Sequence, residues 1–288
     1  MKVIRAYQSL SPRQQQVVRT KQVDIKAVPG RALDLLRSVG EFDRVSDESR
    51  GDLVKLGAIL FGVGFACIFV ASYFYSVIYV SMGFFSLSAV AFFLYFFFRK
   101  RDLPNTMRLF VLPLVAVLRE DMEDKERLSL KVDLRGAKEK SKLQSKERKR
   151  TRNLAIHKLV ESIYVDPWLQ GSARLADGIL IHWKIIDTLR HRDITKRGSS
   201  GKLKFKTKSK VKRLYEVQLT VPKKRYALEE GDAWDGDNVK VNHKDSKSTV
   251  RVRRVEVSRT TGRPAELRPF LQMIASVYKQ VKPVERSA

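Results

Sequence analysis

The sequence predicts a membrane protein in which a two-helix transmembrane hairpin is joined to a cytoplasmic α+β domain with an antiparallel sheet. Three observations lead to this prediction. Residues 56–98 contain no charged side chain. The rest of the chain holds 57 Lys and Arg residues against 31 Asp and Glu residues, a formal net charge of +26. Beyond residue 126, apolar and polar residues alternate in several segments, which is the pattern of half-buried strands.

The uncharged segment is too long for a single crossing of a membrane. As one helix it would measure roughly 64 Å, which is about twice the ~30 Å hydrocarbon core of a bilayer. We therefore expect one helix at about 56–76 and a second at about 80–98, joined by a turn that reaches the far interface. The alternative is a buried helical hairpin inside a large soluble complex, which a segment this apolar disfavours.

Basic residues flank this hairpin at its two outer ends. Arg44, Arg50 and Lys55 precede the first helix, an Arg-Lys-Arg sequence at 99–101 follows the second, and the turn between the helices has no Lys or Arg. The positive-inside rule then places both termini in the cytoplasm. We expect a multi-pass membrane location with almost nothing exposed on the far side.

Small residues recur in the first predicted helix. Ala58, Gly62 and Ala66 are spaced by four residues, and such a face allows two helices to approach closely. The spacing leaves open whether this face packs on the second helix of the hairpin or on a partner. The segment has no ionisable Asp, Glu, Lys, Arg or His, which argues against an ion or proton path formed by this chain alone.

The water-facing parts before residue 126 are predicted to be helical. Residues 1–55 form a cytoplasmic N-terminal arm with helices at about 13–23 and 31–39, the second ending at Gly40. Residues 99–125 form a juxtamembrane helix that lies in the membrane interface or on the domain.

Residues 126–288 are predicted to form one basic α+β domain. Its expected strands and closing helix lie at 128–134, 163–165, 179–189, 202–221, 250–257 and 264–281. A turn signal at 197–201 joins two of these strands into a long antiparallel hairpin. The insert 138–152 is almost wholly polar and is expected to be a flexible loop, a solvated helix or a disordered segment. It could contact acidic lipid or simply be soluble.

The sharpest local feature is a row of cations on the second strand of that hairpin. Every second residue is a lysine, namely Lys202, Lys204, Lys206, Lys208, Lys210 and Lys212. On a strand they would share one face at intervals of about 6.8 Å, and their repulsion costs stability unless an anion compensates. With Lys196, Arg197 and Arg213 they form a candidate polyanion-binding ribbon. The alternative is a solvated edge strand whose lysines prevent aggregation.

No catalytic, metal or cofactor site is predicted. The segment 198–202 has too few residues between its glycines for a phosphate loop, and His191-Arg192-Asp193 lacks the accompanying kinase motifs. The 4 histidines form no HExxH motif and no i,i+4 pair, so a zinc site is not expected. Cys67 is the only cysteine and lies in the apolar segment, which excludes an intrachain disulfide.

Two further sets of residues have structural interpretations. Trp168 and Trp183, at the base of the predicted hairpin, are expected to anchor the core. Asp187, Asp193 and Glu216 lie close in sequence to many lysines and are expected to pair with them.

These observations predict a non-enzymatic, membrane-anchored subunit or scaffold of a membrane assembly. It would present its basic cytoplasmic domain to an acidic partner protein or to anionic lipid, and we expect no small-molecule substrate. The alternative is a membrane-tethered nucleic-acid-binding protein. Phe205 and Tyr215 are the only aromatic residues of the ribbon strand, which gives little support to readout of single strands by base stacking.

Overall fold

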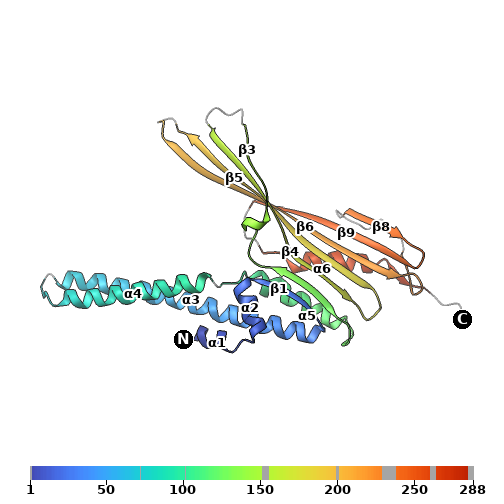
Figure 1. The fold of residues 1–288 in the computed structure, drawn as a ribbon, viewed down its shortest axis with the longest axis horizontal. Coiled ribbons are helices and arrows are strands. Elements are labelled where there is room, and N and C mark those ends of the chain that lie inside the picture. Colours follow the sequence, from blue (N-terminus) through green and yellow to red (C-terminus); the bar gives the residue numbers. More distant parts are fainter. Residues whose placement is uncertain are drawn as a thin grey trace. The chain divides into compact units, whose positions relative to one another are not determined.

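The computed structural model divides the chain into two compact units, residues 1–21 with 35–104 and residues 22–34 with 105–288. Two long apolar helices packed as a hairpin are followed by an α+β domain with an antiparallel sheet (Figure 1). Arg101 and the end of the predicted insert lie outside the described residues. The described residues are 2–71, 73–100, 102–150, 156–198, 201–228, 238–259 and 264–284.

The first unit begins with two short helices, α1 (Lys2–Gln8) and α2 (Pro12–Thr20). Ser11 caps α2 in a capping box, because its Oγ accepts the backbone N–H of Gln14 while its own N–H donates to the Gln14 side chain at 2.7 Å. Lys21 follows in the left-handed conformation, with φ 56°, and this ends the helix before residue 23.

The hairpin helices are α3 (Pro29–Ala71) and α4 (Val77–Lys100). Helix α4 lies close to its predicted position, whereas α3 runs without a break from the predicted arm through the first predicted span. Gly40 does not end a helix, since it keeps a helical backbone within α3. Ion pairs one turn apart, such as Arg44 with Glu41 at 2.7 Å, support the helix across this polar stretch.

The two hairpin helices meet along a seam of small residues. Ser81 Oγ donates to the carbonyl oxygen of Gly64 at 2.7 Å, and Ser88 Oγ donates to that of Gly57 at 2.9 Å. A Cβ on Gly64 would lie 3.2 Å from the Cβ of Phe84. The seven-residue spacing within each helix keeps these contacts on one face, and the serines find backbone acceptors in an apolar setting.

The second unit is built on an antiparallel eight-stranded sheet with the path β1-β2-β4-β5-β6-β9-β8, to which β3 is added beside β4. The strands are β1 (Gln22–Ala27), β2 (Leu128–Asp133), β3 (Leu143–Arg148), β4 (Ile156–Arg174), β5 (Leu180–Arg197), β6 (Leu203–Pro222), β8 (Asn238–His243) and β9 (Lys247–Ser258). A separate pair joins β7 (Tyr226–Leu228) to β10 (Val281–Pro283). The predicted long hairpin is confirmed as β5–β6.

The structure corrects three predictions about strands. Residues 143–148 of the expected flexible insert form β3, which pairs with β4 through backbone hydrogen bonds that need no apolar side chain. The expected short strand at 163–165 is the middle of the long β4. Residues 22–27, inside the expected helical arm, form β1 and pair with β2.

Helices cover one face of the sheet at its base. A π-helical turn (Met107–Val111) leads into α5 (Leu112–Glu120), and α6 (Leu267–Tyr278) lies on the sheet (Figure 1). The aromatic core joins these elements: Phe110 contacts Trp168 and Phe270 at centroid distances of 5.6 and 5.5 Å. The predicted juxtamembrane helix is thus part of the core of this unit, and Trp168 and Trp183 are buried as core anchors.

The sheet continues beyond this helical layer. We call its outer part the distal sheet, which consists of β3 and residues 156–166, 187–197 and 203–213 of the three long strands. The register of β4 shifts between Asp166 and Leu169, so the strand bulges where the base gives way to the distal sheet. Figure 1 shows β3 and β5 running on past the part of the sheet that α6 covers.

Candidate polyanion-binding face

Every lysine of the row is exposed. Five of them lie on β6, and Lys202 immediately precedes that strand. The register of β5 against β6 is regular, so residues directly opposite each other share a face. We call the face with the even-numbered residues of β5 and β6 the basic face. On it, Lys204 is opposite Lys196 and Lys208 is opposite Arg192.

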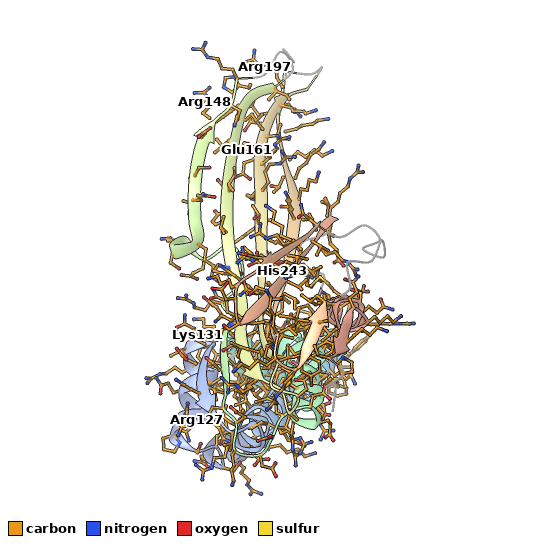
Figure 2. The ribbon with its side chains drawn as sticks, turned by 90° about the vertical axis from the view of Figure 1, so that its right-hand side faces the viewer. Arg127, Lys131, Arg148, Glu161, Arg197 and His243 are labelled. Carbon is orange, nitrogen blue, oxygen red and sulfur yellow. The ribbon has the colours of Figure 1, made fainter. Side chains whose placement is uncertain are left out.

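The basic face does not end at β6. Lys210 is opposite Arg190, and on the outer strands Lys240 of β8 is opposite Arg251 of β9. Basic side chains therefore extend over this face from the base of the sheet to its far end, where Lys196 is opposite Lys204. Figure 2 shows the same far end of the sheet, marked by Arg197 on the other face. The row that the sequence predicts on one strand is thus part of a two-dimensional array of cations.

Acidic groups on this face are few and already paired. Glu161, in the distal sheet (Figure 2), accepts a hydrogen bond from Arg192 Nε at 2.5 Å, and this bond and the charge of Arg192 lower the pKa of Glu161. Glu216 pairs with Arg253 at 2.6 Å. Among the described residues, no carboxylate forms an ion pair with the lysines at 204, 206, 208, 210 and 212.

Two of the predicted ribbon residues do not belong to the basic face. Arg197 is exposed but lies opposite Leu203 on the other face. Arg213 is also on that other face, only 13% exposed, and hydrogen-bonds both carboxylate oxygens of Asp187 at 2.8 and 2.7 Å. Burial opposes its charge, but the bonds and charge of Asp187 raise the pKa of Arg213. Arg213 is therefore a structural cation.

The prediction that Asp187, Asp193 and Glu216 pair with lysines is wrong: two pair with arginines and the third lies beside a histidine. Asp187 pairs with Arg213, and Glu216 pairs with Arg253. Asp193 lies 3.4 Å from a ring nitrogen of His191. The planar guanidinium can bind a carboxylate through two parallel bonds, and these pairings leave the lysine ammonium groups uncompensated.

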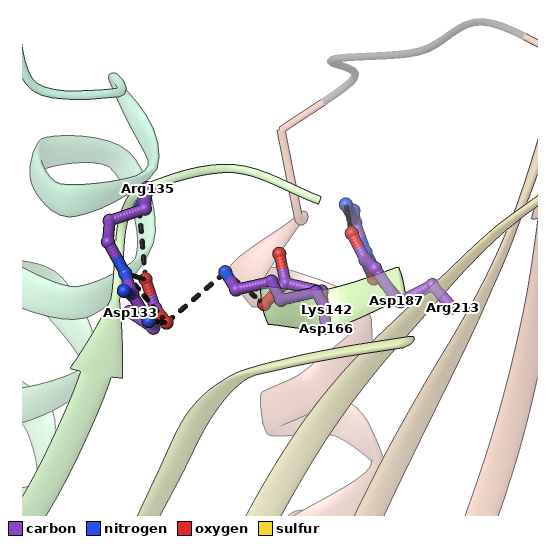
Figure 3. A network of polar contacts seen from close by, with 6 residues as sticks. All are labelled: Asp133, Arg135, Lys142, Asp166, Asp187 and Arg213. Atoms are coloured by element: carbon purple, nitrogen blue, oxygen red, sulfur yellow. Dashed lines mark hydrogen bonds and ion pairs between the residues drawn. The ribbon is translucent and has the colours of Figure 1, made fainter. Parts of the chain in front are cut away.

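A buried ion-pair network lies where the base meets the distal sheet, and sequence reasoning missed it. Lys142, in the turn before β3, is only 6% exposed, and its Nζ lies 2.7 Å from Asp166 and 3.2 Å from Asp133 (Figure 3). Arg135 also binds Asp133. Asp166 is opposite Asp187, so Lys142 and Arg213 neutralise two adjacent carboxylates.

The carboxylates of this network differ in their protonation equilibria. Burial works against the charge of Asp133, but hydrogen bonds from Arg135 and the charge of Lys142 lower its pKa from 3.8 to about 2. At Asp166 burial dominates and raises the pKa, although Lys142 opposes this. Lys142 is therefore the main group that opposes the effect of burial on the pKa of Asp166.

The predicted small-residue face is not the seam of the hairpin. Ala58, Gly62 and Ala66 are all exposed in this chain, and a Cβ on Gly62 would meet no atom within 4 Å. Of the two alternatives, packing on α4 is therefore excluded for this face, and packing on a partner stays a prediction.

Gly64→Val is expected to loosen the hairpin, whereas Gly62→Val should leave it intact. The new side chain at Gly64 would press on Phe84 and the seam, and such overpacking costs about 1–3 kcal/mol. The half-buried thiol of Cys67 can report the change, because a thiol-reactive dye will label it at a lower temperature when the helices separate. Equal labelling curves for both variants would contradict this seam.

An acidic cluster at the polar end of the hairpin is an ion-pair site. Oxygens of Asp43, Asp47 and Asp102 lie within 4.8 Å of one another. Arg50 neutralises two of them, since it pairs with Asp102 at 2.8 Å and also with Asp47. Asp43 accepts the backbone N–H of Leu103 at 3.3 Å. These contacts join α3 to the chain that leaves α4.

No protein-family model, curated protein or solved structure matches the chain. We therefore infer its function from the charge, burial and register of its own residues.

Proposed function

We propose that the chain is a non-enzymatic, membrane-anchored subunit or scaffold that presents its basic face to anionic lipid or to an acidic partner protein. The observation that carries this proposal is the row of exposed lysines on β6, several of which directly oppose cations of β5 and none of which forms an ion pair with a described carboxylate. Of the opposing cations, Arg192 and Arg190 are compensated in part by Glu161, at 2.5 and 3.9 Å. Each opposed pair destabilises the free sheet. A polyanion laid on the face would relieve this repulsion, so that its binding and the folding of the sheet reinforce each other.

In this proposal α3 and α4 cross the bilayer out and back, with both termini in the cytoplasm. Both helices are long and apolar enough for a crossing. Large apolar side chains point outward from them, including Ile59, Phe61, Phe69 and Phe93, each more than half exposed. A helix that is apolar around its whole circumference needs an apolar solvent, which supports lipid as its surroundings.

The basic residues near the membrane would face the anionic cytoplasmic leaflet, where each Lys or Arg close to the surface contributes about 1 kcal/mol of attraction. The alternative polyanion is nucleic acid, whose phosphates would also match the lysine row. Its support is the array of cations alone, because the even-numbered positions from Lys202 to Lys212 include no aromatic side chain on which a base could stack.

The test uses the full chain in nanodiscs of neutral phosphatidylcholine. Binding is measured to vesicles with and without phosphatidylserine, and to mixed-sequence duplex DNA, over a range of salt concentrations. The lysines at 204, 206, 208 and 210 are replaced together by glutamine. We expect tight, salt-sensitive binding to the phosphatidylserine vesicles, and a hundredfold or greater loss in the quadruple variant (~1 kcal/mol per lysine).

The matched control removes the same charge from exposed loop positions, with glutamine in place of Lys125, Lys223, Lys224 and Lys244. If the two quadruple variants lose binding equally, net charge explains the effect and the basic face has no special role. Preferential binding of the duplex, lost only in the strand variant, would favour the nucleic-acid alternative.

A further inference from the structure

The far end of the β5–β6 hairpin combines exposed apolar residues with cations. We call this end the tip, defined by Lys196, Arg197, Lys202, Leu203, Lys204 and Phe205. Phe205 is 81% exposed and Leu203 is 50% exposed, and Phe205 is the most exposed large apolar residue described in the second unit. Comparable exposure occurs at Tyr73, with 85%, beside the turn between α3 and α4.

The register arranges the tip so that its apolar and basic groups alternate. Leu203 is opposite Arg197 and Phe205 is opposite Thr195 on one face, while Lys204 is opposite Lys196 on the other. The turn is held by hydrogen bonds from Gly198 N–H to the Lys202 carbonyl oxygen, at 2.8 Å, and from Gly201 N–H to the Gly198 carbonyl oxygen, at 3.0 Å. Leu203 and Phe205 therefore share one exposed face of the tip with Arg197, while Lys196 and Lys204 lie on the opposite face of the same turn.

We propose that the tip inserts Leu203 and Phe205 into the interface of an anionic phospholipid bilayer while the four cations of the tip bind lipid phosphates. This inference deepens the proposed function, on which it rests for the choice of a polyanion. Apolar side chains flanked by Lys and Arg are the pattern of elements that lie in a membrane interface. The aliphatic Leu203 favours lipid over nucleic acid, since it can enter hydrocarbon but cannot stack on a base as an aromatic ring does.

Anionic phospholipid could come from two sources, the bilayer that holds α3 and α4 or a second bilayer. The test uses the full chain with Cys67→Ala and Thr207→Cys, labelled beside Phe205 with a polarity-sensitive dye. In one arm the chain is in proteoliposomes, with or without phosphatidylserine, that contain nitroxide-labelled lipid. In the other arm the chain is in neutral nanodiscs, and vesicles that contain nitroxide-labelled lipid, with or without phosphatidylserine, are added.

We expect a blue shift of the dye and nitroxide quenching, both of which require phosphatidylserine. If they occur in the proteoliposomes, the tip contacts the chain's own bilayer; if they occur when vesicles are added to the nanodiscs, it contacts a second bilayer. Leu203→Ser with Phe205→Ser should weaken the tip's membrane contact by roughly tenfold or more. The matched control, Val255→Ser with Val257→Ser, removes two exposed apolar side chains from β9 and should leave the quenching unchanged.

A dye that stays in water in both arms, although phosphatidylserine vesicles still bind in a lysine-dependent way, would overturn the tip proposal and leave the proposed function standing. Loss of vesicle binding altogether would overturn both. Quenching that is blocked by duplex DNA and never seen with lipid would assign the tip to nucleic acid and overturn the proposal in this form.

Discussion

Replacing Lys142 by methionine is expected to destabilise the second unit by about 3–5 kcal/mol, the cost typical of removing one partner of a buried ion pair. The methionine fills a similar volume, so the loss is electrostatic. Asp166 would then be a buried carboxylate without its cation, and Asp133 would retain only Arg135. Chemical unfolding of the full chain in detergent, followed by the near-ultraviolet circular dichroism of the buried Trp168 and Trp183, measures the change.

The matched control is Lys131→Gln. Lys131 and Asp24 form an ion pair of 3.3 Å on the same sheet, but their side chains are 65% and 70% exposed, and exposed pairs contribute at most about 1 kcal/mol. Adding Asp166→Asn to Lys142→Met should recover much of the loss, because it removes the orphaned charge. Similar small losses for Lys142→Met and Lys131→Gln would show that the network does not stabilise the sheet.

The same network makes stability depend on pH at the acidic end. The pKa of Asp133 is about 2 in the folded protein against 3.8 ordinarily, so its contribution of up to about 2 kcal/mol is present above pH ~4 and is lost as the pH falls toward 2. The raised pKa of Asp166 acts in the opposite sense, with stability lost as the pH rises through it. The Asp133→Asn variant should show a smaller loss of stability over the acidic range than the parent chain. An unchanged slope would contradict this assignment.

Replacing the lysines at 204, 208 and 210 by glutamine is expected to stabilise the protein while it weakens binding to anionic vesicles. Each of these lysines is opposite Lys196, Arg192 or Arg190, and relief of a like-charge pair is worth about 0.2–1 kcal/mol. The gain should be largest at Lys204, because Glu161 pairs with Arg192 and Arg190 but not with Lys196. The thermal midpoint of the sheet should therefore rise in low salt. The gain should vanish at about 1 M salt, where the screening length is about 3 Å.

Lys184→Gln is the control for this effect. Lys184 is on the same face of β5, but it is opposite Glu216, so its removal relieves no repulsion from that residue and should not raise the midpoint. If the triple variant is less stable than the parent in low salt, the opposed cations are not repelling one another, and the main support for a polyanion partner is lost.

The sequence was informative where one local property decides the structure. The absence of charged residues was enough to locate α4. The alternation of lysines with other residues was enough to locate β6 and to predict that its lysines are exposed. The same alternation could also have shown that Arg213, at an odd-numbered position, lies on the face opposite to the lysines. Local signals failed at Gly40, because burial of the neighbouring Val39 and Phe42 and the ion pairs of the following turns support α3 through it.

Features that depend on distant partners were not predictable. The strand β1 is fixed by pairing with β2, about a hundred residues later, and β3 is a polar edge strand whose pairing with β4 leaves no apolar pattern. Lys142 looks like any other lysine of a basic insert, and only its burial between Asp133 and Asp166 distinguishes it. The second row of cations, on β5, could be recognised only from the register of the β5–β6 hairpin.

The sidedness of the chain in sealed membrane vesicles tests the proposed topology most directly. In a Cys67→Ala background, single cysteines are placed at Tyr75, in the turn between α3 and α4, and at Lys206, on the basic face, and are labelled with a membrane-impermeant reagent alongside tags at both termini. We predict that the tags and the cysteine at 206 react from one side and the cysteine at 75 from the other. Reaction of both cysteines from the same side, or termini on opposite sides, would contradict a hairpin that crosses the bilayer twice and holds the basic face on the side of both termini.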